Sequence, residues 1–229
     1  MSLAALIEVG TLPALALVAG IAMGGVWLAF FLYEDRDKPE PLTLVAKTFG
    51  IGALLAWVAA AFQYLAIVGL AAVGAEAMSI AGIALTAAIE EGVKFLAVFT
   101  SLRHAKDLDE PIDYMVYMVI VALGFAPMEN LLFLFAAESV TELVGLALLR
   151  FIGATLMHAI AAGFIGYFWA RRELLRGLII AVALHASFNY LILKEGPVAY
   201  PILFVTILAI PVFSYFDKLH NIHDYAKQE

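Results

Sequence analysis

Seven long apolar runs, separated by short polar breaks, constrain this chain more than any other feature of its sequence. A bilayer core about 30 Å thick is crossed by about 20 apolar residues in an α-helix. The runs predict helices at residues 8–33, 42–72, 78–100, 114–137, 145–170, 174–193 and 199–216. We therefore expect an all-α fold, a polytopic membrane helical bundle of about seven transmembrane helices.

The composition agrees with lipid as the main solvent. Of the 229 residues, 64% are hydrophobic and only 14% are charged, which is too apolar for a water-soluble surface. No polar break is long enough to form a second domain. We expect residues 1–229 to be a single integral membrane domain of a multi-pass protein in the cell (inner or plasma) membrane, with a short polar tail at 217–229.

Charge and cysteine content exclude several functions. The net charge of -7 and the lack of a basic stripe argue against a nucleic-acid partner, because nothing would neutralise the phosphates. The chain has no cysteine, which excludes disulfides, thiolate metal sites and cysteine nucleophiles. The bilayer is the one partner that composition alone requires.

The distribution of lysine and arginine predicts the orientation of the bundle, because cytoplasmic loops carry an excess of these residues. One set of alternating helix ends contains Arg36, Lys38, Lys47, Arg103, Lys106, Arg171, Arg172, Arg176, Lys218 and Lys227. Only Lys194 lies in a loop on the other side, while Lys94 and Arg150 fall within or at the margin of predicted spans. We expect the N-terminus outside and the C-terminus inside.

A few polar side chains fall inside the predicted spans, where an ionisable group costs roughly 2.5 to 3.5 kcal/mol unless it meets a partner or water. They are Glu90, Glu91 and Lys94 in the third run, Glu129 and Asn130 in the fourth, His158 in the fifth, and His185 and Asn189 in the sixth. With a rise of 1.5 Å per residue, the acids and histidines lie near one depth in four helices. We expect them to converge on a single polar site halfway through the bilayer.

Spacing within the helices adds detail to this site. Glu90 and Glu91 precede Lys94 by four and three residues, so the lysine can neutralise either carboxylate and leave the other to face the bundle. The spacing does not decide between them. Two further pairs share a helix face, namely His185 with Asn189 and Phe125 with Glu129.

Carboxylates and histidines, with no serine paired to a lysine or histidine at evident spacing, favour activation of water by a general base over a covalent nucleophile. Histidine and asparagine can donate to the oxyanion of a tetrahedral intermediate. We favour metal-independent glutamate catalysis without a cofactor. A zinc site made of Glu91, Glu129, His158 and His185 stays an open alternative, although the chain has no HExxH motif.

Four ordered motifs resemble those of a known family. The segment EEGVK at 90–94 is similar to the EExxK signature of the PrsW intramembrane proteases, and FAPMEN at 125–130 is similar to their FxxxEN motif. His158 and the segment HASFN at 185–189 resemble their two later histidine motifs. The resemblance covers most of the chain, and that family in turn resembles the CAAX prenyl proteases.

The resemblance implies an intramembrane endopeptidase that cleaves a single-span membrane protein, typically an anti-sigma factor in regulated proteolysis. The implied roles are Glu90 or Glu91 as base, Glu129, His158 and His185 as partners, Asn189 as an oxyanion or orienting group, and Lys94, Phe125 and Asn130 as supporting residues. CAAX proteases have a histidine where this chain has Glu129, so their mechanism does not transfer whole.

Other functions use the same residue types. A transporter or proton relay also needs buried glutamates and histidines, but it would move ions and cleave nothing. Seven spans also match a heptahelical receptor, although the last span has no lysine to bind retinal. Haem ligation by His158 and His185 is a further alternative, which a visible absorption spectrum would test.

Overall fold

A computed structural model describes residues 3–34, 39–102, 108–194 and 197–226, and within these ranges it contains helices and no strand. The helices are α1 (Leu3–Glu34), α2 (Leu42–Ala72), α3 (Ile80–Leu102), α4 (Asp113–Leu134), α5 (Val140–Arg150), the π-helical turn η1 (Phe151–Thr155), α6 (Leu156–Ala170), α7 (Leu174–Leu193) and α8 (Ala199–Ala226). The segments α5, η1 and α6 follow one another without a break. The predicted all-α bundle is confirmed.

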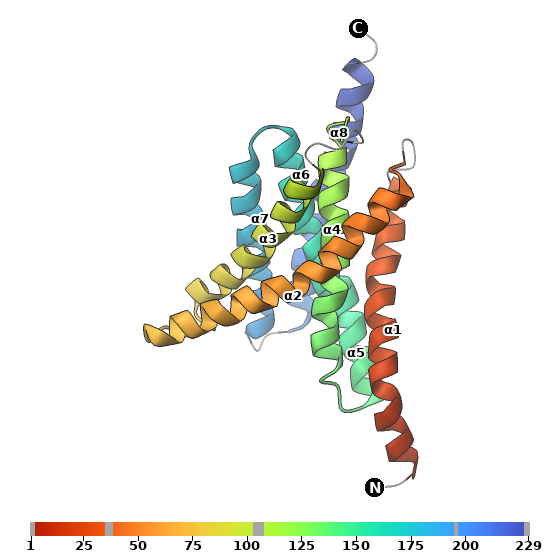
Figure 1. The fold of residues 1–229 in the computed structure, drawn as a ribbon, viewed down its shortest axis with the longest axis vertical. Helices are drawn as coiled ribbons and strands as arrows, with labels where there is room; N and C mark the ends of the chain where they lie inside the picture. Colours follow the sequence, from red (N-terminus) through yellow and green to blue (C-terminus); the bar gives the residue numbers. More distant parts are fainter. Residues whose placement is uncertain (1–2, 35–38, 103–107, 195–196, 227–229) are drawn as a thin grey trace.

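Successive helices run in alternating directions, and the two chain ends lie at opposite ends of the molecule (Figure 1). Among the described residues, six helical segments are long and apolar enough to cross a membrane, counting α5, η1 and α6 as one. The remaining long helix, α3, has 23 residues and includes Glu90, Glu91 and Lys94. Its three charges are what set it apart from the other spans.

Sidedness stays a prediction. The cations Arg36, Lys38, Arg103, Lys106 and Lys227, on which it partly rests, lie outside the described residues. Within those residues, Lys47 is near the start of α2, Arg171 and Arg172 lie between α6 and α7, and Arg176 is near the start of α7. These helix ends lie toward the end of the bundle opposite the start of α1 (Figure 1). Lys194, at the end of α7, lies at the other end.

Several helix ends differ from the prediction. The first helix begins at Leu3 instead of residue 8, and the fourth ends at Leu134 instead of residue 137. The fifth helix begins at Val140 instead of residue 145, because the Ser139 hydroxyl accepts a hydrogen bond from the backbone N–H of Glu142 and caps the helix. The last helix continues to Ala226 instead of ending at residue 216, so most of the polar tail is helical. Residues 217–226 contain no proline or glycine that would end it.

Helix α4 forms the centre of the bundle and is buried along most of its length. Helix α2 crosses it at backbone contact, since a Cβ on Gly52 would lie 2.1 Å from the Val121 carbonyl oxygen. From the other side, a Cβ on Gly124 would lie 2.0 Å from the Phe49 carbonyl oxygen. Small residues at such crossings let membrane helices approach closely. This crossing fixes α2 obliquely over α4.

Because α2 is oblique, its C-terminal half and the start of α3 diverge from α4 (Figure 1). A cavity of about 350 Å³ lies in this region, between α2, α3, α4, η1 and α7. Its walls are mainly apolar, and at least one polar residue of each predicted motif lines it, namely Glu90, Glu129, His158, His185 and Asn189. The fold thus leaves open space directly beside the groups that the sequence singles out.

Candidate active site

The acidic pair of α3 is divided between two environments. Glu90, Glu91 and Lys94 are all buried. Lys94 Nζ lies 2.6 Å from Glu91 Oε1, so the lysine pairs with the glutamate three residues before it. Glu90 points elsewhere, and its Oε1 accepts a hydrogen bond of 2.7 Å from Gln63 Nε2 of α2. Lys94 therefore pairs with Glu91, which the spacing alone did not decide.

Glu91 and Lys94 connect α3 to the two histidines. His185 Nδ1 of α7 lies 2.7 Å from Glu91 Oε1, and Lys94 Nζ lies 3.0 Å from His158 Nδ1 of α6. The lysine also lies 5.1 Å from the centre of the Phe125 ring, which favours a cation above its face. Phe125 packs against the His158 ring as well, with ring centres 5.6 Å apart.

A second carboxylate holds the other side of His158. Glu129 Oε2 of α4 lies 2.5 Å from His158 Nε2. Its other oxygen, Oε1, accepts a hydrogen bond of 2.7 Å from Arg150 Nη2 at the end of α5. The side chain of Glu129 is 24% exposed, whereas that of Glu91 is fully buried. The two carboxylates therefore have equivalent partners but different access to the cavity.

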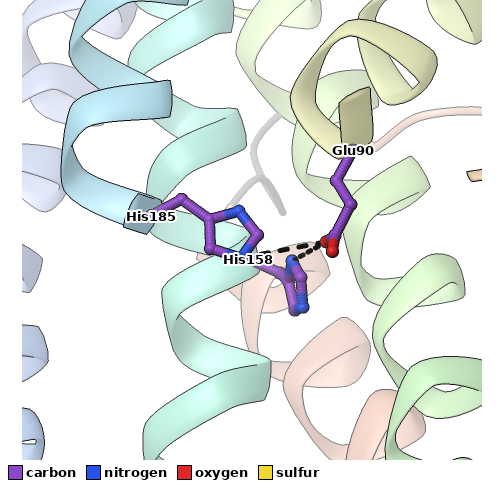
Figure 2. A group of neighbouring side chains, drawn as sticks. All are labelled: Glu90, His158 and His185. Atoms are coloured by element: carbon purple, nitrogen blue, oxygen red, sulfur yellow. Dashed lines mark ion pairs between the residues drawn. The ribbon is translucent and has the colours of Figure 1, made fainter. Parts of the chain in front are cut away.

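The hydrogen bonds to the two carboxylates define which nitrogen of each imidazole carries the lone pair. A histidine bound to a carboxylate donates its N–H to it, and the tautomer follows from that contact. His185 uses Nδ1 for Glu91 and His158 uses Nε2 for Glu129, so the lone pairs lie on His185 Nε2 and His158 Nδ1. These two atoms lie 3.8 and 3.9 Å from Glu90 Oε2 (Figure 2).

Glu90 Oε2 is a buried acceptor for which no hydrogen-bond donor is found among the described residues. Together with the two imidazole nitrogens it forms a group of ligand atoms that lie within 4.8 Å of one another. Figure 2 shows the three side chains converging from α3, α6 and α7. Lys94 Nζ lies within hydrogen-bond distance of one of the three acceptors, His158 Nδ1, but Glu90 Oε2 still calls for a cation or for a donated proton, because unpaired buried acceptors are costly.

The donor set fits a zinc ion. Two histidines and one glutamate are a ligand set found in catalytic zinc sites, which keep a fourth position open. Metal-binding histidines almost always donate their second N–H to a carboxylate or carbonyl, which is the arrangement that Glu91 and Glu129 provide here. One contact competes with a metal, since Lys94 Nζ already lies at hydrogen-bond distance from His158 Nδ1.

The cavity gives this group a connection to the outside of the bundle. Glu90, His158 and His185 line it, as do Glu129 and the half-buried Asn189. A smaller pocket of about 30 Å³ between α2 and α4 reaches Glu90 and Glu129 from another direction. Substrate and water thus have space beside Glu90.

Two contributors were not predicted from the sequence. Gln63 holds Glu90, and the rule that selected polar residues inside apolar runs would have found it. Arg150 was placed at the margin of a span, and its bonds to Glu129 and Asn130 were not foreseen. No pattern in the sequence indicates which residue each of them bonds to, because the two members of each pair come from different helices.

The fold and the site define a polytopic membrane protein whose buried carboxylate–histidine centre opens on an internal cavity. Residues 40–216 match the model of a protein family described as PrsW family intramembrane metalloprotease. The chain belongs to this family, and it is an intramembrane protease. This assignment decides against the transporter, receptor and haem-protein alternatives.

Known relatives agree with the family assignment. The chain is 33% identical over 189 residues to "Protease PrsW" of Geobacillus kaustophilus, covering 77% of this chain and 79% of that protein. It is 27% identical to "Protease PrsW" of Clostridioides difficile over 219 residues, which are 91% and 90% of the two chains. The corresponding protein of Bacillus subtilis is 26% identical, over 76% and 81%. No solved structure matches the chain significantly.

Proposed function

We propose that this protease hydrolyses a peptide bond of a single-span membrane protein at a centre formed by Glu90, His158 and His185. The observation that carries the proposal is the convergence beside the cavity of Glu90 Oε2 with His158 Nδ1 and His185 Nε2, the two imidazole nitrogens that do not bond to a carboxylate. We place the protein in the cell membrane, and we infer an anti-sigma-factor-like substrate from the resemblance alone.

A divalent cation of the zinc class fits this centre best, with Glu90, His158 and His185 as its ligands. Such an ion would supply Lewis-acid activation of water and of the scissile carbonyl. Glu91 and Glu129 then orient the imidazoles, because each accepts from the ring nitrogen that does not face Glu90. Neither belongs to the group of three converging ligand atoms. The proposed ligands include both histidines of the zinc site considered from the sequence, with Glu90 in place of Glu91 and Glu129.

The contact between Lys94 and His158 favours a second, metal-free mechanism. If Lys94 keeps its hydrogen bond to His158 Nδ1, that lone pair is satisfied and the site loses one ligand. Glu90 Oε2 and His185 Nε2, 3.8 Å apart, would then hold a water molecule. Glu90 would act as general base toward it, which is the glutamate mechanism that the sequence favoured.

The surrounding residues have distinct proposed roles in either mechanism. Gln63 fixes the direction of Glu90 through Oε1 and leaves Oε2 toward the histidines. Asn189 lines the cavity next to His185, one helical turn away on α7, where its amide can donate to the oxyanion of a tetrahedral intermediate. The apolar walls suit a segment of a transmembrane helix, because the cavity offers few polar partners before the centre is reached.

The test is cleavage of a single-span substrate by the purified full-length protein in liposomes. We expect the wild type to cut it at one position, mapped by mass spectrometry, and Glu90→Gln to be inactive. The matched control is Glu173→Gln, since Glu173 is an exposed acid in the break between α6 and α7. Full activity of Glu90→Gln would overturn the assignment of the centre.

Chelation separates the two mechanisms. A zinc-dependent enzyme should lose cleavage when treated with 1,10-phenanthroline and regain it when zinc is added in slight excess. The metal-free mechanism predicts no loss at any chelator concentration that leaves the protein folded. The same preparations should be analysed for bound metal, with about one ion per chain expected for the first mechanism and none for the second.

A further inference from the structure

Arg150 occupies a position that its place in the sequence does not suggest. It is the last residue of α5, its side chain is 12% exposed, and it bonds to two adjacent residues of α4. Nη2 donates to Glu129 Oε1 over 2.7 Å and Nε donates to Asn130 Oδ1 over 2.6 Å. Its guanidinium also lies 3.8 Å from the centre of the Phe133 ring. One arginine thus holds both polar residues of the FAPMEN segment.

The π-helical turn η1 allows Asn130 of α4 to bond to both Arg150 and Thr155. The amide of Asn130 accepts from Arg150 and donates to Thr155 Oγ1 over 2.9 Å, so it bridges residues five apart. In a regular α-helix two such residues point about 140° apart around the axis. The i→i+5 hydrogen bonds of a π-turn bring them closer to one face. Asn130 therefore bonds to both ends of the turn that separates α5 from α6.

These contacts determine how the Glu129 carboxylate is presented. With Oε1 bound to Arg150, the other oxygen, Oε2, faces His158 and accepts from its Nε2. Because Nε2 carries the proton, the lone pair of His158 lies on Nδ1, which has Lys94 Nζ 3.0 Å away on one side and faces Glu90 3.9 Å away on the other. The orientation of one ligand atom of the centre thus depends on an arginine that does not reach the centre itself.

We propose that Arg150 is a positioning residue of this protease: with Asn130 and η1 it fixes the Glu129 carboxylate so that His158 Nδ1 stays directed at Glu90. The inference rests on the proposed function, because it takes Glu90, His158 and His185 as the hydrolytic centre. Arg150 acts only through Glu129 in this role. Lysine should replace it poorly, since a single ammonium cannot bond both Glu129 and Asn130 in the geometry of a planar guanidinium.

The first test compares Arg150→Met and Arg150→Lys with the wild type in the cleavage assay. Loss of a hydrogen-bonding partner behind a ligand typically costs 10- to 100-fold in activity, so we expect about that loss in kcat for Arg150→Met. Arg150→Lys should recover part of it. Arg176→Met is the matched control, because Arg176 is an exposed arginine that bonds to Glu173 on the bundle surface. Wild-type kcat in Arg150→Met would overturn the proposal.

The second test observes the histidine directly and needs neither substrate nor metal. In full-length protein labelled with ¹⁵N-histidine, NMR distinguishes a ring protonated on Nε2 from one protonated on Nδ1. We expect His158 as the Nε2–H tautomer and His185 as the Nδ1–H tautomer. In Arg150→Met the His158 signals should shift toward a mixture while those of His185 stay unchanged. Unchanged His158 signals, or equal changes in both rings, would refute a positioning role.

A double-mutant cycle shows whether Arg150 acts through Glu129. If it does, Arg150→Met should cause little further loss of kcat in a Glu129→Gln background. Independent, multiplying losses would contradict the proposal. A wild type that cleaves no substrate would refute the proposed function instead, and the tautomer measurement would still decide whether Arg150 orients His158. The two failures are therefore distinguishable.

Discussion

The two histidines of the centre are held in parallel ways in two different environments. On one side, His185 donates to Glu91, which is paired with Lys94, and both partners are fully buried. On the other side, His158 donates to Glu129, which is paired with Arg150, and these side chains are 24% and 12% exposed. Each side consists of an imidazole, a carboxylate and a cation.

The difference in burial indicates a division of tasks. A buried ion pair is costly to assemble and more costly to break, because removal of one partner leaves an uncompensated charge. The Glu91–Lys94 side therefore joins α3 to α7 and contributes to the integrity of the fold as well as to the site. The Glu129–Arg150 side lines the cavity and is partly exposed, so its substitution should affect stability less.

Removal of either imidazole should have the largest effect and tests whether the two sides are catalytically equivalent. We expect His158→Ala and His185→Ala each to lower kcat/KM by roughly 10³-fold or more, since each removes one of the three groups of the centre. Cleavage rates of the purified variants in liposomes provide the measurement. Retention of activity by only one of the two variants would show that His158 and His185 are not catalytically equivalent.

Metal affinity should distinguish the centre from the groups behind it. If the centre binds zinc, Glu90→Gln should abolish binding, while Glu129→Gln should weaken it by about 10- to 100-fold. Isothermal titration of the chelated protein with zinc would give both values. Tighter binding by Glu90→Gln than by Glu129→Gln would mean that Glu129, and not Glu90, is the ligand.

The difference in burial between the two ion pairs should also appear as a difference in fold stability. Glu91→Gln leaves the buried Lys94 ammonium without its counter-charge and should destabilise the fold by about 3 to 5 kcal/mol. Glu129→Gln keeps a polar partner for a partly exposed arginine and should cost about 1 kcal/mol. Thermal unfolding in detergent micelles should show the two variants well separated. Equal melting temperatures would remove the distinction between the two sides.

The smallest effect is expected at the cavity wall. Asn189 is half-buried beside His185 and is not a partner of either carboxylate in the described contacts. Asn189→Ala should lower kcat by about 100-fold, the lower end of the loss caused by removing one oxyanion donor, and leave the melting temperature unchanged. The nearby Ser187→Ala is a suitable control, because its exposed hydroxyl bonds only to the Ala183 carbonyl within α7. An effect as large as that of His185→Ala would move Asn189 into the centre itself.

Much of the architecture could be predicted from local properties of the sequence. Hydropathy placed the helices closely, with misplaced ends mainly at Ser139, where a cap begins α5 early, and beyond residue 216, where α8 continues. The rule that charged groups inside lipid need partners selected the residues that meet at the site. The rule could be applied to the sequence alone because the free-energy cost of burying a charge depends on the residue type and on its depth in the membrane.

Hydropathy does not show which helix is central or which side chain faces which. The apolar windows of α4 and α2 have similar mean hydropathy, 1.7 and 2.0, yet 78% of the first and 17% of the second are buried. Lipid and protein interior are equally apolar, so helix packing in a membrane is selected by small residues and polar contacts between distant segments. The Gly52–Val121 crossing is one such contact.

The sequence by itself determined that acids and imidazoles lie at one depth in separate helices, because depth follows from position along a helix of constant rise. Only the tertiary structure decided that Lys94 takes Glu91 and leaves Glu90 to the histidines, and that a π-turn brings Arg150 to Glu129. The rotation of a helix about its axis is set by its neighbours. Such choices depend on contacts between residues far apart in the chain, as between Glu91 and His185, which are 94 positions apart.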